Sequence, residues 1–148
     1  MSEKMEILND RLFEVGPSTL FGAFADPEKL TQWWGPHGFA NRIDRFDFRP
    51  GGDWHITMTA SDGTDFDNRS TFQEIVPSER IVFLHHLPMH VYTMEMRFVA
   101  EGGGTRLHWR MLFEPTAENL QLKKFIAAAN EQNFDRLEAL LQQLNEGR

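Results

Sequence analysis

Residues 116–146, TAENLQLKKFIAAANEQNFDRLEALLQQLNE, decide the fold of this chain. Their apolar side chains recur at helical spacing, and the main ones are Leu122, Ile126, Ala129, Leu137, Leu140 and Leu144. This spacing predicts one amphipathic helix over 117–146, with Asp135 and Glu138 on its exposed face. Thr116 is a natural N-cap, and Gly147 is a natural stop. A helix of about 45 Å cannot bury the apolar side chains along its own face, so the rest of the chain must supply a broad apolar surface to cover them.

Two amides, Asn130 and Asn133, interrupt the apolar stripe at its centre, beside the small side chain of Ala129. Burying an amide is costly unless it finds a hydrogen-bond partner. The partners can come from the protein itself, as they do for most buried polar groups. Alternatively, the helix faces a cavity here and the amides meet a ligand. Both interpretations make this part of the helix the first place to look for a site.

The composition favours a single globular domain over residues 1–148. The chain has no cysteine, which excludes disulfides and thiolate chemistry. Its net charge of −7 argues against nucleic acid and anionic membranes as partners. The first residues contain no apolar signal region and no run is long enough to span a membrane, so we expect a cytoplasmic protein.

The chain before the long helix is expected to form seven strands and two short helices. Strand patterns occupy residues 6–15, 39–49, 54–59, 66–72, 80–86, 92–98 and 106–113. A first short helix starts at Pro17, and a second has Asp26 as N-cap and Pro27 at its first position. Trp33 and Trp34 on the second helix either pack it against the sheet or gate a pocket. Hairpin turns between the strands favour a curved antiparallel sheet with the long helix across its apolar face.

Five motifs in register resemble one family over nearly the whole chain. They are residues 26–39 (DPEKL with WWGPHGF), 47–54 (DFRPGGDW), 68–81 (NR with PSERI), 103–107 (GGTRL) and 135–137 (DRL). In this order they are similar to the AHSA-type family, the homologues of the activator of the Hsp chaperone ATPase, within the START-like SRPBCC superfamily. The resemblance implies an α+β helix-grip fold, like that of START domains and the birch-pollen allergen, with a cavity between the terminal helix and the sheet.

The resemblance does not fix a substrate, because members bind different apolar ligands and some are enzymes. Many relatives carry Gly-Trp-Asn-Gln where this chain has Ala129-Asn130-Glu131-Gln132, which predicts a roomier and more polar pocket. We therefore expect a small hydrophobic ligand and no cofactor. The alternative is an enzyme of the cyclase or hydrolase type acting in the same cavity. A chaperone-interaction module ranks last, because that activity in the eukaryotic activator also involves an N-terminal domain. A homodimer is left open.

Alternation on the strands predicts which side chains meet the ligand. The expected ligand-binding residues are Trp54, Met58, Phe72, Met96 and Trp109 on the sheet, with Asn130 and Asn133 on the helix. The pocket should touch one of the two amides and at least two of the residues Trp54, Phe72, Met96 and Trp109.

One acid–base pair can be built on the same face, from Glu74 and His85. A tight turn at 78–79 would place Phe72 opposite His85 and Glu74 opposite Phe83, unless a bulge intervenes, so that Glu74 and His85 become diagonal neighbours. Such a pair in an apolar pocket is typical of general acid–base catalysis. A glutamate near a strand end can equally turn to solvent. His85, His86 and His90 lack the spacing of a metal site, and we expect none.

Overall fold

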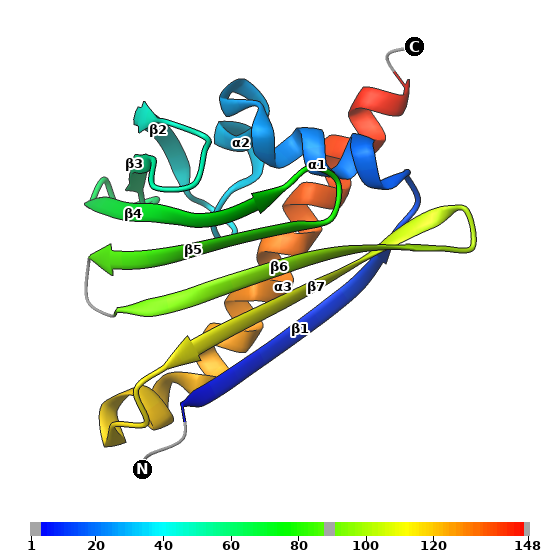
Figure 1. Cartoon of the computed structure of the whole chain (residues 1–148). Helices are drawn as coiled ribbons and strands as arrows, with labels where there is room; N and C mark the ends of the chain where they lie inside the picture. Colours follow the sequence, from blue (N-terminus) through cyan, green and yellow to red (C-terminus); the bar gives the residue numbers. More distant parts are fainter. Residues whose placement is uncertain (1–3, 88–90, 147–148) are drawn as a thin grey trace.

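The computed structural model describes residues 4–87 and 91–146. Seven strands and three helices follow one another along the chain (Figure 1). In order they are β1 (Met5–Phe13), α1 (Pro17–Ala25), α2 (Pro27–Trp33), β2 (Ala40–Phe46), β3 (Asp53–Thr59), β4 (Asp65–Val76), β5 (Arg80–Leu87), β6 (Tyr92–Glu101), β7 (Gly104–Phe113) and α3 (Ala117–Glu146). The element order is the one predicted from the sequence.

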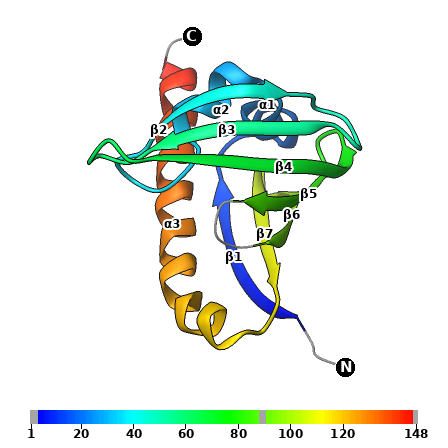
Figure 2. The same ribbon diagram turned by 90° about the vertical axis from the view of Figure 1, so that its left-hand side faces the viewer.

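The strands form one antiparallel sheet in the order β1-β7-β6-β5-β4-β3-β2. Strands β2 to β7 are joined as successive neighbours, and β1 adds to the sheet beside β7. Strands β2, β3 and β4 run across the direction of β1 and α3, which shows that the sheet is strongly twisted (Figure 2). This twist gives the sheet a concave face, which α3 crosses.

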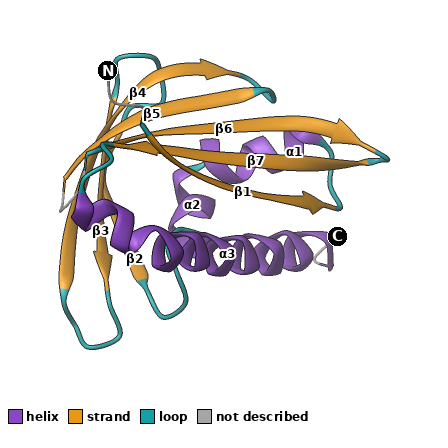
Figure 3. Cartoon of the chain, turned by 90° about the horizontal axis from the view of Figure 1, so that it is seen from below, coloured by secondary structure: helices purple, strands orange, loops and turns teal. Residues whose placement is uncertain are grey.

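Helix α3 lies along the concave face, and α1 and α2 cover the same side near its C-terminal end (Figure 3). The inward residues of the strands and the C-terminal half of α3 form one apolar core. Phe134 and Leu137 of α3 are fully buried in it, and the ring of Phe134 packs edge-on against Phe13 and Trp109. The architecture is the predicted α+β helix-grip fold.

The predicted N-caps of α2 and α3 are confirmed, whereas Gly147, the predicted stop of the long helix, lies outside the described residues. The Thr116 hydroxyl accepts a hydrogen bond from the Asn119 backbone N–H at 3.1 Å, which caps α3. The Asp26 carboxylate accepts one from the Glu28 N–H at 3.0 Å, and Pro27 occupies the first turn of α2. Both caps satisfy N–H groups that have no partner inside the helix.

The buried face of α3 matches the prediction best in its C-terminal half. Leu137 and Leu140 are buried there, whereas Ile126 and Leu144 are only partly buried. Leu122 is also only partly buried. The N-terminal half also contributes Phe125 and Asn130 to the lining of a cavity.

Candidate functional site

A cavity of about 390 Å³ lies between α3, the inner face of the sheet and the loop that joins α2 to β2. From the sheet it is lined by Met58, Phe66, Asn68, His85, Tyr92, Met94, Trp109 and Met111. From the loop and α3 it is lined by Trp34, Gly35, Pro36, Phe39, Phe125, Asn130 and Asn133. Its volume and its mostly apolar, aromatic lining are typical of small-molecule sites.

Strand alternation sets which sheet residues reach the cavity. Neighbouring strands place His85 opposite Tyr92, and Met94 opposite Met111. Because side chains opposite each other in an antiparallel pair point to the same face, these four line one continuous wall. The register of β5, β6 and β7 therefore determines where these side chains lie in the wall.

A polar group lies within this wall, made by Asn68 of β4, His85 of β5 and Tyr92 of β6. The His85 Nε2 lies 3.1 Å from the Asn68 Oδ1, and the His85 ring stacks on Tyr92 with centroids 4.5 Å apart. Burial raises the pKa of Tyr92 well above its ordinary value, because the phenolate would be poorly solvated. This side of the cavity therefore presents polar groups, one each from three neighbouring strands.

The two amides of α3 have hydrogen-bond partners in the protein and also line the cavity. Asn130 donates to the Asn9 Oδ1 at 2.9 Å and lies 3.3 Å from the Met111 sulfur, while Asn133 donates to the Trp33 carbonyl at 3.0 Å. Protein partners thus account for their burial. Both side chains also line the cavity, so they form the polar part of its helical wall.

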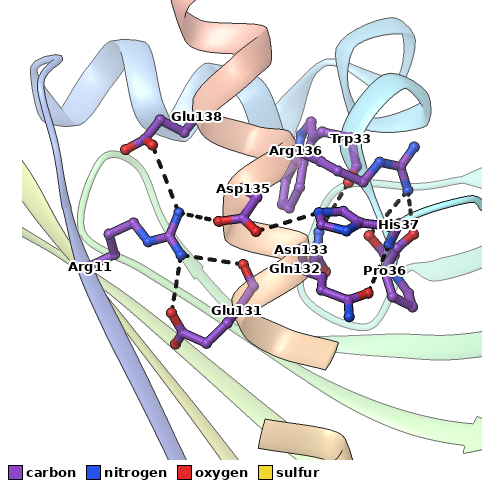
Figure 4. A network of polar contacts seen from close by, with 11 residues as sticks. Arg11, Trp33, Pro36, His37, Glu131, Gln132, Asn133, Asp135, Arg136 and Glu138 are labelled. Atoms are coloured by element: carbon purple, nitrogen blue, oxygen red, sulfur yellow. Dashed lines mark hydrogen bonds and ion pairs between the residues drawn. The ribbon is translucent and has the colours of Figure 1, made fainter. Parts of the chain in front are cut away.

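The loop at the cavity, residues 34–39, is tied to α3 by main-chain contacts (Figure 4). The Arg136 Nη1 lies 2.8 Å from the Trp34 carbonyl and 3.1 Å from those of Gly35 and Pro36, and its Nη2 lies 3.2 Å from the Gln32 carbonyl. Burial lowers the pKa of Arg136, and the carbonyls offset part of that desolvation. One guanidinium therefore fixes the loop that closes one side of the cavity.

A second set of polar contacts lies on the outer side of the same helix (Figure 4). Arg11 of β1 is 3.1 Å from Glu131 and 2.9 Å from Asp135, and Asp135 is 3.4 Å from the His37 Nε2. Asp135 is exposed as predicted, and about half of the Glu138 side chain is accessible. These contacts join β1, α3 and the loop, but they lie at the surface and outside the cavity lining.

Four of the seven predicted ligand-binding residues line the cavity, namely Met58, Trp109, Asn130 and Asn133. Trp54, Phe72 and Met96 do not, and the prediction that at least two of the four residues Trp54, Phe72, Met96 and Trp109 touch the cavity was wrong. These three line a separate void of about 10 Å³.

Trp34 divides the two spaces. It lines both, with its ring 4.9 Å from that of Trp54 and 5.5 Å from that of Trp109. Trp33 and Trp34 are both buried, as expected of residues that pack α2 against the sheet. Strand alternation alone could not predict that the indole of Trp34 lies between Trp54 and Trp109.

The register predicted for Glu74 and His85 was wrong, because a bulge intervenes. Phe72 pairs with Phe83, but Glu74 pairs with Val82, so Gln73 is an extra residue in β4. The extra residue turns Glu74 to the outer face, where it lies 3.5 Å from Arg80 with 47% of its side chain exposed. His85 is buried and lines the cavity. The two residues therefore do not form an acid–base pair.

Sequence reasoning missed several lining residues, chiefly Gly35, Pro36 and Phe39 of the loop and Phe125 of α3. Phe125 is 72% exposed, and an exposed aromatic on α3 is the one signal that could have marked the cavity's open side. Of the predicted histidine cluster, His90 lies outside the described residues. Within residues 4–87 and 91–146, no three His, Cys, Asp or Glu side chains are grouped as a metal ion would need. In the same ranges, no helix combines the length and apolarity that crossing a membrane requires.

Comparison with known proteins decides the family. The family described as activator of Hsp90 ATPase homolog 1-like protein matches residues 14–142. The chain belongs to this family. The predicted resemblance is thereby confirmed, and it covers every part of the cavity.

Several solved structures share this fold over nearly their whole length. A protein from Rhodobacter sphaeroides superposes with a TM-score of 0.85 at 19% identity, covering 94% of this chain and 93% of that one. A Chromobacterium violaceum protein gives 0.81 at 23% identity, over 92% and 96%. The AHSA1 protein from Silicibacter pomeroyi gives 0.78 at 21% identity, over 94% and 99%. No curated protein matches the sequence. At these identities the likeness supports the fold and no particular ligand.

Proposed function

We propose that this protein binds a small hydrophobic molecule in the cavity between α3 and the sheet. The observation that carries the proposal is the cavity itself, in which eleven of the fifteen lining residues are apolar, aromatic, glycine or proline. Three of them, Met58, Met94 and Met111, have flexible thioether side chains that adapt to a ligand's shape. A soluble domain gains nothing in stability from such a space, because unfilled apolar volume costs packing energy.

Binding is tested with N-phenyl-1-naphthylamine, an uncharged dye that fluoresces when it leaves water. The wild type should bind it saturably, and Asn130→Trp should abolish binding by filling the cavity. Ala128→Trp is the matched control, because Ala128 lies on α3 but is exposed. Met58→Trp fills the space from the opposite wall, so a folding defect in one variant cannot mimic the result. If both filled variants bind the dye as tightly as the wild type, the cavity is not the binding site.

The enzyme alternative has lost the acid–base pair that motivated it, because only His85 of the two residues lines the cavity. Glu74 lies on the outer face of the sheet, and none of the described residues that line the cavity is an Asp or Glu. His85 has Asn68 rather than a carboxylate beside its Nε2. We therefore propose binding rather than turnover.

A further inference from the structure

We infer that the ligand carries a hydrogen-bond donor, a hydroxyl or N–H group, and that the side-chain oxygen of Asn130 or Asn133 accepts from it. This inference rests on the proposed binding function and adds to it the polar group by which the ligand is recognised. Three features support it: the hydrogen bonds that orient the two amides, the burial of both residues, and their place in the cavity lining.

The orientation of the Asn130 amide is set by Asn9 of β1. The Asn9 Nδ2 donates to the Ala127 carbonyl at 3.1 Å and to the Glu131 carboxylate at 2.7 Å, and both of these groups are acceptors. The Asn9 amide therefore cannot be turned round, and its oxygen is the atom left to face Asn130. Asn130 must then present its own Nδ2, which lies 2.9 Å from that oxygen and 3.3 Å from the Met111 sulfur. Both N–H groups of Asn130 are thereby used inside the protein.

The amide of Asn133 is oriented by the main chain of α2. Its Nδ2 lies 3.0 Å from the Trp33 carbonyl (Figure 4), and a carbonyl can only accept. Asn133, like Asn130, therefore commits its nitrogen to the protein and leaves its oxygen over. Among residues 4–87 and 91–146, no group donates to either side-chain oxygen, and neither oxygen is fully enclosed. Both oxygens can still accept a hydrogen bond.

The surroundings of the two amides favour a ligand as the donor. Asn130 is only 8% exposed and Asn133 only 5%, and both line the cavity between α3 and the sheet. Leaving a buried amide oxygen without a donor is costly. A ligand that fills the cavity excludes water, so it must supply the donor itself or leave the oxygens unsatisfied. An O–H or N–H group supplies it, whereas an ether or ketone oxygen offers only a second acceptor.

The spacing of the two amides allows one polar group to serve either of them. Asn130 and Asn133 are three residues apart on one helix, which places their Cβ atoms about 5–6 Å from each other on the same face. A ligand bound along α3 can therefore place its donor at one oxygen or the other without leaving the cavity. The rest of the ligand then meets the apolar part of the lining.

The requirement for a donor is tested with two naphthalenes that differ in one group. 2-Naphthol has a hydroxyl that is neutral at pH 7, and 2-methoxynaphthalene keeps the rings and the oxygen without the donor. Hydrophobic burial alone would favour the ether, which has one more carbon. In isothermal titration calorimetry the wild type should instead bind the naphthol at least about tenfold more tightly, because the ether leaves an amide oxygen buried without a donor.

The inference and the proposed function fail in different ways in this experiment. An affinity of the ether within about threefold of that of the naphthol, or above it, would overturn the inference and leave the proposed function intact. If N-phenyl-1-naphthylamine and both naphthalenes fail to bind, the proposed function itself fails.

Two leucine variants test the assignment to the amides. Asn130→Leu and Asn133→Leu keep roughly the volume of the side chain and remove its acceptor. In at least one of them the preference for naphthol over ether should fall below about threefold. Phe125→Leu is the control, because it changes an exposed lining residue and no amide, and it should keep the wild-type preference. If both amide variants still bind N-phenyl-1-naphthylamine and both keep that preference, the donor binds elsewhere and the assignment is wrong.

Discussion

Replacing Arg136 by glutamine should loosen the loop that closes the cavity. The guanidinium lies within 3.2 Å of four main-chain carbonyls, and glutamine keeps an amide donor but loses the charge and the planar fork. Hydrogen bonds to a charged group contribute about 1.5–3 kcal/mol each in a buried setting. Arg136 is only partly buried, and water can reach some of the freed carbonyls.

We therefore expect the loss of one to two such bonds, a fall of about 2–4 kcal/mol in the free energy of unfolding. For a chain of this size each kcal/mol lowers the melting temperature by roughly 2–4 °C, so Tm should drop by roughly 4–16 °C. The Tm of Arg136→Lys should lie between those of the wild type and the glutamine variant, because a lysine ammonium cannot hydrogen-bond to as many carbonyls at once as a guanidinium.

Thermal unfolding followed by circular dichroism measures the global effect, and hydrogen exchange of the peptide covering 34–39 measures the local one. The His37 backbone N–H, which donates to the Gln132 side chain at 3.2 Å, should exchange faster in the variant. Arg69→Gln is the control, because Arg69 makes an exposed ion pair with Asp67 at 3.1 Å that should contribute less than about 1 kcal/mol. If Arg136→Gln lowers Tm no more than this control does, or leaves hydrogen exchange of residues 34–39 unchanged, the hydrogen bonds of Arg136 to the main-chain carbonyls do not stabilise the loop.

Two further predictions concern the cavity and its surroundings. Gly35→Ala should destabilise the fold by about 1–2 kcal/mol in urea unfolding, because Gly35 has φ +92° and an added Cβ would lie 2.5 Å from the Met58 Cε. Gly22→Ala, where that space is open, should instead stabilise α1 by about 0.5–1 kcal/mol; a loss at Gly22 or none at Gly35 would contradict this account. The raised pKa of Tyr92 favours the folded state below the ordinary phenol pKa of about 10, and this contribution is lost as pH rises above that value, because only the unfolded chain then ionises readily. Wild-type stability should therefore fall relative to Tyr92→Phe between pH values of about 9 and 11, and parallel unfolding curves would show that the phenol does not titrate differently in the two states.

The elements of this fold could be predicted because each carries a local pattern. Alternation along residues 106–113 and 92–98 specified β7 and β6 to within a few residues, and helical spacing specified α3. The cavity's helical wall could also be predicted, since two amides in an apolar stripe require an explanation wherever the helix packs. These features depend on periodicity, which a single sequence records.

The sheet wall of the site was harder to predict, for two physical reasons. The bulge at Gln73 reverses the direction of Glu74, yet a bulge needs only one extra residue and leaves no distinct composition. The insertion of Trp34 between Trp54 and Trp109 depends on how α2 docks, which is a matter of tertiary packing. Alternation could therefore identify the inward residues, but it could not say which of them a neighbouring indole would cover.

The hydrogen bonds between α3 and the loop bear on how the lining of this cavity can change during evolution. Arg136 and Asn133 bind only main-chain carbonyls, those of residues 32–36. A carbonyl is the same whatever side chain its residue carries, so these hydrogen bonds do not depend on the loop's side chains, although the positive φ of Gly35 still requires a glycine there. Substitutions of Pro36 and Phe39, which line the cavity, should therefore leave these hydrogen bonds in place. The anchoring of the loop and the shape of the cavity wall thereby depend on different residues, and one can change in evolution without loss of the other.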